Sequence, residues 1–180
     1  MKEEIELERK DRKYIESEQN EMDMIGKNRD VVKKLIEKKI TITTMESCTG
    51  GFLISSITDI EGSSNITEGG FVTYSNKQKV AEGVPEDIIK TYGVYSKETA
   101  SKMAEACREK MKCDIGIGIT GTLSNIDTNN KDSIQGEVYF CIDFMGKMKV
   151  DRKIRVPIES RHEQKKFIVH NVLEELSKII

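Results

Sequence analysis

An eight-residue segment in which isoleucine alternates with glycine, DIGIGITG at 114–121, limits most strongly how this chain folds. Alternation with period two is typical of a β-strand, because successive side chains point to opposite faces. One face of this strand carries isoleucine, and the other carries almost no side chain. We therefore expect a core strand whose glycine face lets a neighbouring element, or a ligand, approach the backbone closely.

The segments on both sides of this strand predict further regular elements. Ser96 can cap a helix over residues 97–112, and EVYFCIDF at 137–144 is followed by a turn at 145–147 and a period-two segment up to residue 156, which predicts a β-hairpin. A last helix is expected over about residues 162–179. Two apolar stripes at helical spacing support these helices: Ala100, Met103, Ala104, Cys107 and Met111 in the first, and Ile168, Val172, Leu176 and Ile179 in the second.

The N-terminal half alternates helix and strand. A helix is predicted from about residue 28, a strand from the β-branched run at 40–44, a helix after Gly51, and a strand in EGGFVTYSN at 68–76. Early alternation followed by a hairpin predicts an α/β fold. We expect a three-layer-like α/β sandwich with a mixed sheet and a C-terminal β-hairpin plus helix.

The charge distribution divides the chain into two parts. Residues 1–26 carry nine acidic and five basic residues without a sustained heptad, which predicts a charged extension that is helical or disordered. The domain proper is expected over residues 27–180. Its length is sufficient for one substantial core.

The composition excludes several classes of protein. A net charge of -2 argues against a nucleic-acid binder, and no apolar run approaches the roughly 18 residues of a membrane span. The charged N-terminus does not resemble a secretory signal, so a cytoplasmic protein is expected. The four cysteines show no C-x-x-C pairing and the two histidines no ligand cluster, so we expect no metal.

A hydroxyl-rich turn stands between the first predicted strand and its helix, in TITTMESCTGGFLISS at 41–56. Ligands of open α/β sheets gather at such positions, where the helix N-terminus offers free amide donors. Ser47 would stand at the edge of an oxyanion hole or phosphate cradle. The alternative interpretation is that Ser47 or Thr49 only caps the helix.

A serine nucleophile needs a base. Neither histidine follows a strand, whereas TYSNKQK places Lys77 and Lys79 directly after one. A lysine can act as a base when burial lowers its pKa from about 10.4. Taken singly, each of these lysines is better explained as a solvated surface residue.

Together the motifs resemble a known family. ESCTGG, GSS, GGFVTYSNKQKVAEGVP, GVYSKETASKMAEACREKMKCDIGIGITG and GEVYF follow in the order typical of the C-terminal domain of the competence-damage inducible protein CinA. Standalone members of that family are nicotinamide mononucleotide amidohydrolases, or deamidases, of pyridine nucleotide salvage. The resemblance implies hydrolysis of the carboxamide to nicotinic acid mononucleotide and ammonia, with Ser47 as nucleophile and Lys79 as base, while Lys77 falls at a variable position.

Further expectations concern the surroundings of this pair. The amides of Cys48, Thr49 or Gly50 would hold the developing oxyanion. Contacts with a pyridine nucleotide substrate are expected from Glu46, Tyr74, Thr120, Gly121 and Arg161. Glu46 would orient Lys79 or bind a ribose hydroxyl, and Arg161 matches an arginine that precedes the last helix in the family. The resemblance implies no cofactor and a homo-oligomer.

One segment departs from the family pattern. Active members continue the strand that ends in I-T-G with a loop of the type G-x-A-G-P-x-G-G, whereas this chain has GTLSNIDTNNKDSIQG. Two other readings therefore stay open. One is an amidase that uses Cys48 as nucleophile with Glu46 and a lysine, and the other is a non-catalytic nucleotide-binding or assembly module.

Overall fold

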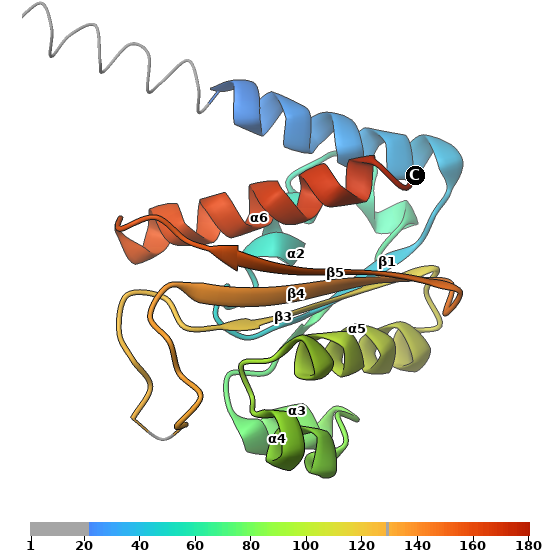
Figure 1. Cartoon of the computed structure of the whole chain (residues 1–180). Coiled ribbons are helices and arrows are strands. Elements are labelled where there is room, and N and C mark those ends of the chain that lie inside the picture. The colour runs from blue at the N-terminus through green and yellow to red at the C-terminus, as the bar shows by residue number, and fades with distance from the viewer. Residues whose placement is uncertain (1–21, 129) are drawn as a thin grey trace, which may run out of the picture.

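The computed structural model describes residues 22–128 and 130–180 of the chain (Figure 1). Most of the charged extension predicted for residues 1–26 lies outside these ranges. Residues 22–38 are helical, and Val31, Val32 and Leu35 on this helix are buried against the rest of the molecule. No helix in the described ranges is long and apolar enough to cross a membrane.

A five-stranded mixed sheet forms the centre of the molecule, in the order β2-β1-β3-β4-β5. Strands β2, β1 and β3 are parallel, β4 runs antiparallel to β3, and β5 antiparallel to β4. The strands are β1 (Ile42–Glu46), β2 (Phe71–Val72), β3 (Ile115–Gly121), β4 (Glu137–Phe144) and β5 (Met148–Arg155). The short β2 and the charged β5 lie at the two edges.

Helices cover both faces of this sheet (Figure 1). Helix α5 lies on one face with α3 and α4 beyond it, and the other face carries α2, α6 and the helix of residues 22–38. Their bounds are α2 (Phe52–Thr58), α3 (Asn76–Ala81), α4 (Glu86–Tyr92), α5 (Lys97–Met111) and α6 (Arg161–Ser177), with a 3₁₀ turn η1 at Ser63–Asn65. The predicted three-layer α/β sandwich with a C-terminal hairpin and helix is confirmed.

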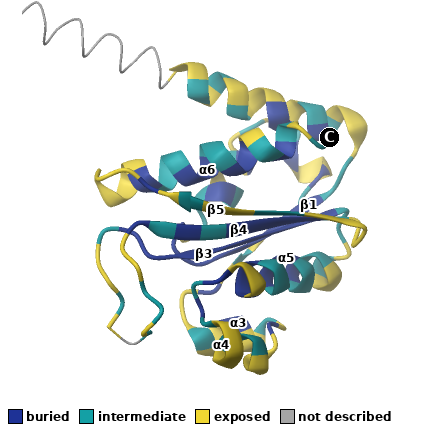
Figure 2. Ribbon diagram, in the orientation of Figure 1, coloured by how far each residue is buried: buried dark blue, intermediate teal, exposed yellow. Residues whose placement is uncertain are grey.

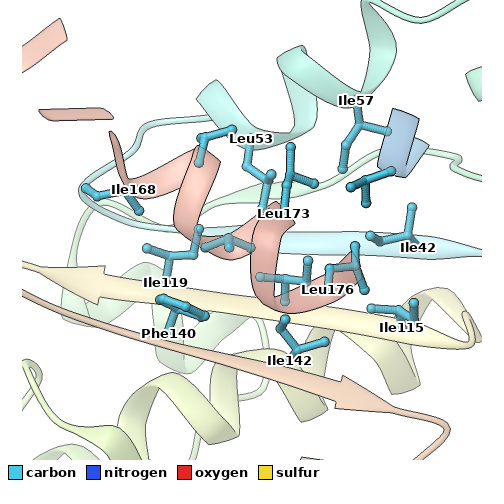
Figure 3. Close-up of a cluster of buried hydrophobic side chains, with 14 of the residues drawn as sticks. Ile42, Leu53, Ile57, Ile115, Ile119, Phe140, Ile142, Ile168, Leu173 and Leu176 are labelled. Atoms are coloured by element: carbon cyan, nitrogen blue, oxygen red, sulfur yellow. The ribbon is translucent and has the colours of Figure 1, made fainter. Parts of the chain in front are cut away.

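The larger core cluster lies between the sheet and α2 and α6. Figure 2 shows β3 and β4 largely buried, whereas the outer sides of the helices and much of the edge strand β5 are exposed. Close packing of aliphatic side chains from strands and helices removes a large apolar area from water, which is the main source of folding free energy. Figure 3 shows the cluster, with Ile42, Ile115, Ile119, Phe140 and Ile142 from the strands facing Leu53, Ile57, Ile168, Leu173 and Leu176 from the helices.

The glycine face of β3 is covered by α5. A Cβ atom at Gly116 would collide with the carbonyl oxygen of Ala104, and one at Gly118 with the carbonyl oxygen of Ala100. The element that approaches the glycine backbone is therefore a helix and not a ligand. Ala100 and Ala104 are both fully buried, so small residues on both sides let the helix lie directly on the strand.

The strand predicted at 68–76 is much shorter than expected. Only Phe71 and Val72 pair with β1, and after Thr73 the chain leaves the sheet for α3, whose start Ser75 caps by accepting a hydrogen bond from the amide of Gln78. The sequence analysis did not predict α3 or α4. Helices of six and seven residues are too short to establish a helical period. Ser75 caps the start of α3, whereas α4 follows Pro85 without a side-chain cap.

Candidate active site

Ser47 follows the last residue of β1 and starts the turn that leads into α2. Its amide still donates to the carbonyl oxygen of Ile119 at 3.0 Å, so the serine is held by the sheet. Gly50 and Gly51 then adopt φ values of 62° and 91°. Glycine is favoured at such positive φ, because most other residues meet steric strain there. The glycine pair therefore lets the chain turn sharply beside the serine.

Glu46 holds this turn from the inside. One carboxylate oxygen accepts from the amides of Gly51 and Leu53 at 3.1 and 3.0 Å, and the other from the amide of Ile54 at 2.9 Å and the hydroxyl of Thr44 at 3.1 Å. The residue is completely buried. The carboxylate caps α2 and forms none of its hydrogen bonds with Lys79, while a contact of Glu46 with ribose stays a prediction. The capping role considered for Ser47 or Thr49 belongs to Glu46.

Lys79 meets Ser47 in the interior. The Nζ atom lies 3.0 Å from Ser47 Oγ and donates to the carbonyl oxygen of Thr73 at 2.8 Å. Lys79 is only 1% exposed although it belongs to the short surface helix α3. The structure therefore brings together the serine and the lysine that the sequence predicted, and Lys77 on the same helix is exposed.

Burial determines the charge of this lysine. Desolvation lowers the pKa of Lys79 to about 8, while the nearby Cys48 and Asp127 act in the opposite direction. Within the described residues no carboxylate forms a hydrogen bond or ion pair with the ammonium group. A neutral amine is consequently present in part of the population near pH 7, and it can accept the proton of a hydroxyl group.

Cys48 is buried next to this pair and is a poor nucleophile. Burial raises the pKa of its thiol to about 12, although Lys79 acts to lower it. Because the thiolate is the reactive form, a thiol with such a high pKa is largely unreactive near neutral pH. The arrangement favours Ser47 over Cys48.

The three predicted oxyanion donors differ in availability. The amide of Gly50 already donates to the carbonyl oxygen of Ser47 at 3.0 Å, so it is occupied in this structure. The amides of Cys48 and Thr49 have no acceptor among the hydrogen bonds of the described residues. Thr49 Oγ1 is also buried without a partner there. Two backbone donors thus remain beside Ser47.

Tyr74 and Arg161, both predicted to bind substrate, lie in contact although 87 residues separate them. Arg161 Nη2 donates to Tyr74 Oη at 3.1 Å, and both side chains are exposed, Tyr74 by 66%. Tyr74 follows Thr73, whose carbonyl oxygen holds Lys79, and Arg161 is the first residue of α6. Arg161 also lies close enough to the turn of residues 47–51, called the serine turn below, for its charge to act on the Cys48 thiol.

Thr120 and Gly121 lie at the end of β3 and are both buried. The Thr120 hydroxyl donates to the carbonyl oxygen of Val94 at 2.9 Å, and a Cβ atom at Gly121 would come within 2.6 Å of the Glu137 carbonyl oxygen. Their contacts hold the fold together. A contact of either residue with substrate stays a prediction.

The glycine-poor loop of residues 122–136 is fixed by polar side chains. Asp127 accepts from the hydroxyl of Tyr95 at 2.7 Å, and Asp132 accepts from the Tyr95 amide at 2.7 Å. Asn76, at the start of α3, donates to Asn130 at 3.1 Å. The loop is thereby joined to the helix that carries Lys79.

Two groups at this site were not predicted from the sequence. The carbonyl oxygen of Thr73 holds Lys79, and a backbone acceptor leaves no signal in side-chain patterns. The side chain of Lys165, on α6, extends to the serine turn, since its Nζ atom would lie 3.4 Å from a Cβ atom at Gly50. Its position four residues after Arg161, hence on the same helix face, was a signal that could have found it.

Metal-ligating clusters are not part of this arrangement. The residues that the structure describes contain no group of three or more His, Cys, Asp or Glu side chains placed to hold a metal ion. The groups gathered at the turn are instead a hydroxyl, an amine and backbone amides. Such a set suits acyl transfer through a serine nucleophile.

Comparison with known proteins places this domain in a family. The family model described as the CinA C-terminal domain matches residues 26–180. A protein described as competence-damage inducible from Moorella thermoacetica is 40% identical over 121 residues, which cover 67% of this chain and 29% of that protein. A CinA-like protein of Dictyoglomus turgidum is 37% identical over 119 residues, 66% of this chain and 29% of that protein. The chain thus matches less than a third of these relatives' length.

Solved structures share the fold. A competence/damage inducible protein of Agrobacterium tumefaciens superposes with a TM-score of 0.78 at 26% identity, covering 86% of this chain and 93% of that one. A CinA superfamily protein of Klebsiella pneumoniae gives a TM-score of 0.79 at 21% identity, covering 86% and 96%. The chain belongs to the CinA C-terminal domain family.

Proposed function

We propose that this member of the CinA C-terminal domain family is a serine amidohydrolase that converts nicotinamide mononucleotide to nicotinic acid mononucleotide and ammonia. The observation that carries the proposal is the buried contact of 3.0 Å between Lys79 Nζ and Ser47 Oγ. A lysine is seldom buried without a carboxylate partner, because desolvation penalises its charge. Its position against a serine hydroxyl is explained by proton transfer.

The first half of the reaction forms an acyl-enzyme. Neutral Lys79 takes the proton of Ser47 Oγ as this oxygen attacks the amide carbon, and the amides of Cys48 and Thr49 stabilise the oxyanion. The C–N bond then breaks while the lysine ammonium returns its proton to the leaving nitrogen, which departs as ammonia. Ser47 Oγ is left esterified to the nicotinoyl group, and Lys79 is again neutral.

The second half releases the acid. Lys79 takes a proton from a water molecule that attacks the ester carbon, and the same two amides hold the second oxyanion. Collapse of this intermediate breaks the bond to Ser47 Oγ, which recovers a proton from Lys79. Each half-reaction thus uses the lysine once as base and once as acid, so the pair is unchanged after turnover.

Substrate binding is assigned to the exposed groups around the turn. Tyr74 and Arg161 are both exposed and would contact the ribose phosphate. The loop of residues 122–136 borders α3 through Asn76 and Asn130 and would close the pocket on the opposite side. The substrate class is therefore a small nucleotide amide, in a reaction of pyridine nucleotide salvage.

The test is ammonia release from nicotinamide mononucleotide, with the product identified by liquid chromatography. We expect Ser47→Ala and Lys79→Met to lower kcat by at least about 10³-fold, because each removes a group that acts in both half-reactions. Lys77→Met is the matched control, since Lys77 lies exposed on the same helix. Wild-type kcat/KM should rise with pH through about 8 as Lys79 loses its proton.

Two further variants decide between the alternatives. Cys48→Ala should retain turnover, because the buried thiol is protonated near neutral pH. Full activity of Ser47→Ala together with loss in Cys48→Ala would establish the cysteine mechanism instead. If the wild-type protein binds the mononucleotide but releases no ammonia at high enzyme concentration, a non-catalytic nucleotide-binding module would be the function.

A further inference from the structure

We infer that Lys165 is a specificity-determining residue that, together with Arg161, binds a phosphomonoester dianion above the serine turn. The identity of the nucleotide rests on the proposed function, whereas the anion site itself rests on geometry. Arg161 was expected to bind substrate from the sequence, but Lys165 had no assigned role. The consequence is a preference for mononucleotides over the corresponding nucleosides and phosphodiesters.

The first step in the argument is the position of Lys165. Its Nζ atom would lie 3.4 Å from a Cβ atom at Gly50, three residues after Ser47. The side chain is half-buried, and no hydrogen bond or ion pair joins its ammonium group to any described residue. A cation placed against a backbone turn without an acidic partner is ready to bind an anion.

The second step is the position of Arg161. It lies four residues before Lys165 in α6, so both side chains project from one face of the helix. Its guanidinium contacts the Tyr74 hydroxyl at 3.1 Å, and Phe52 of α2 packs edge-on against His162 with ring centroids 5.4 Å apart. These contacts set the start of α6 directly beside the start of α2.

The third step is the rigidity of this helix start. Gln164, only 3% exposed, donates to the carbonyl oxygen of Pro157 at 2.9 Å and accepts from the Ser124 hydroxyl at 2.9 Å. Ser160 caps α6 by accepting from the amide of Glu163. The first turn of α6 is thus fixed between two loops, and the positions of Arg161 and Lys165 are fixed with it.

The nearby carboxylates do not neutralise these cations. Glu163 lies 3.2 Å from Lys166 Nζ, and Glu46 is buried in its contacts with the amides of α2. The Arg161 charge is among those that lower the pKa of Cys48 against the larger effect of burial, which agrees with a positive potential at the turn. Two cations match the two charges of a terminal phosphate better than the single charge of a phosphodiester.

The experiment measures binding independently of turnover, by isothermal titration calorimetry with ribose 5-phosphate. We expect Lys165→Met to weaken binding by about 10-fold or more, in line with the loss of one charge-assisted contact. Lys165→Arg should restore it to within about threefold of wild type, since the charge is retained. Lys166→Met is the matched control and should bind as wild type does, because Lys166 is paired with Glu163.

A kinetic measurement gives the second readout. The ratio of kcat/KM for nicotinamide mononucleotide over its nucleoside should fall about 10-fold or more in Lys165→Met, through KM rather than kcat. Equal ribose 5-phosphate binding by Lys165→Met and wild type, or no wild-type binding at about 10 mM, overturns the inference. If ribose 5-phosphate binding depends on Lys165 but no ammonia is released, only the proposed function is contradicted. If ammonia is released but ribose 5-phosphate binding does not depend on Lys165, only this inference is contradicted.

Discussion

The two segments that border the Ser47 and Lys79 pair are held in place by different means. The serine turn is fixed by one buried carboxylate, Glu46, which accepts three amide hydrogen bonds and one from a hydroxyl. The loop of residues 122–136 is fixed by several partly buried polar side chains, among them Asp127 and Asp132, which both bind Tyr95. One segment depends on a single group and the other on a distributed network.

This difference separates the turn that holds the proposed nucleophile from the loop that is joined to α3. Hydrogen bonds to a buried charge are strong, and removing the charge leaves several donors unpaired at once. A network of partly exposed groups loses little when one member is removed, because water can replace it. Substitutions in the serine turn should therefore have larger effects than substitutions in the loop.

The largest effect on stability is expected for Glu46→Gln. The side chain keeps its shape, but an NH₂ group would face amide donors of α2, so the free energy of unfolding should fall by about 3 kcal/mol. Urea denaturation measures this change. Glu61→Gln, at an exposed position, is the control and should stay within about 0.5 kcal/mol of wild type. A similarly small change for Glu46→Gln would remove the distinction between the two segments.

Lys79→Met is expected to have an intermediate effect on stability, and to stabilise the protein where Glu46→Gln destabilises it. The buried lysine has a folded pKa of about 8, below its unfolded value of about 10.5, so its charge destabilises the fold at neutral pH. Removing it should raise the free energy of unfolding by about 1–2 kcal/mol, after subtraction of two lost hydrogen bonds.

The pH dependence of this difference sharpens the test. Between pH 8 and 10.5 the unfolded chain binds more protons than the folded one, so wild-type stability from this group rises with pH. The difference in the free energy of unfolding between wild type and Lys79→Met should narrow over that range, as measured by urea denaturation. Lys77→Met should show no such trend. A constant difference across this range would show that burial does not lower the pKa of Lys79 below its unfolded value.

The smallest effect is expected in the loop, for Asp132→Ala. The substitution removes the acceptor of the Tyr95 amide, which water can partly replace, so the loss should be about 1 kcal/mol. Lys131→Ala, at the adjacent exposed position, is the control. A loss as large as that of Glu46→Gln would show that the loop network acts as one unit.

The sequence predicted the parts of the site that depend on local pattern. The strand, turn and helix around Ser47 follow from β-branched residues and two glycines, and Lys79 was singled out by resemblance to the family motif. The structure confirms their contact, which spacing alone did not predict, because it depends on how α3 folds back onto the end of β1. The glycine alternation likewise predicted a close neighbour of β3 but not that α5 is this neighbour.

The role of Glu46 could not be read from the sequence. A glutamate before a serine in a turn is compatible with catalysis, substrate binding or capping, and only its burial and four donors distinguish these. Tyr74 and Arg161 were each predicted to bind substrate, but their mutual contact was not predicted. Lys165 was overlooked within a helix that was interpreted only as cover for the core. The sequence did not show in which direction the Lys165 side chain points from α6, and this direction was needed to predict its place at the site.

The outer strand β5 has a consequence for behaviour at high concentration. It lies at one edge of the sheet and exposes Lys149, Arg152, Lys153 and Arg155. A second copy that added its own β5 there would place like charges opposite one another, which opposes strand addition and fibrillar aggregation. The opposite edge, β2, offers only two residues to a new strand. Both edges of the sheet therefore oppose pairing with strands of other molecules, which is the step that leads open sheets to aggregate.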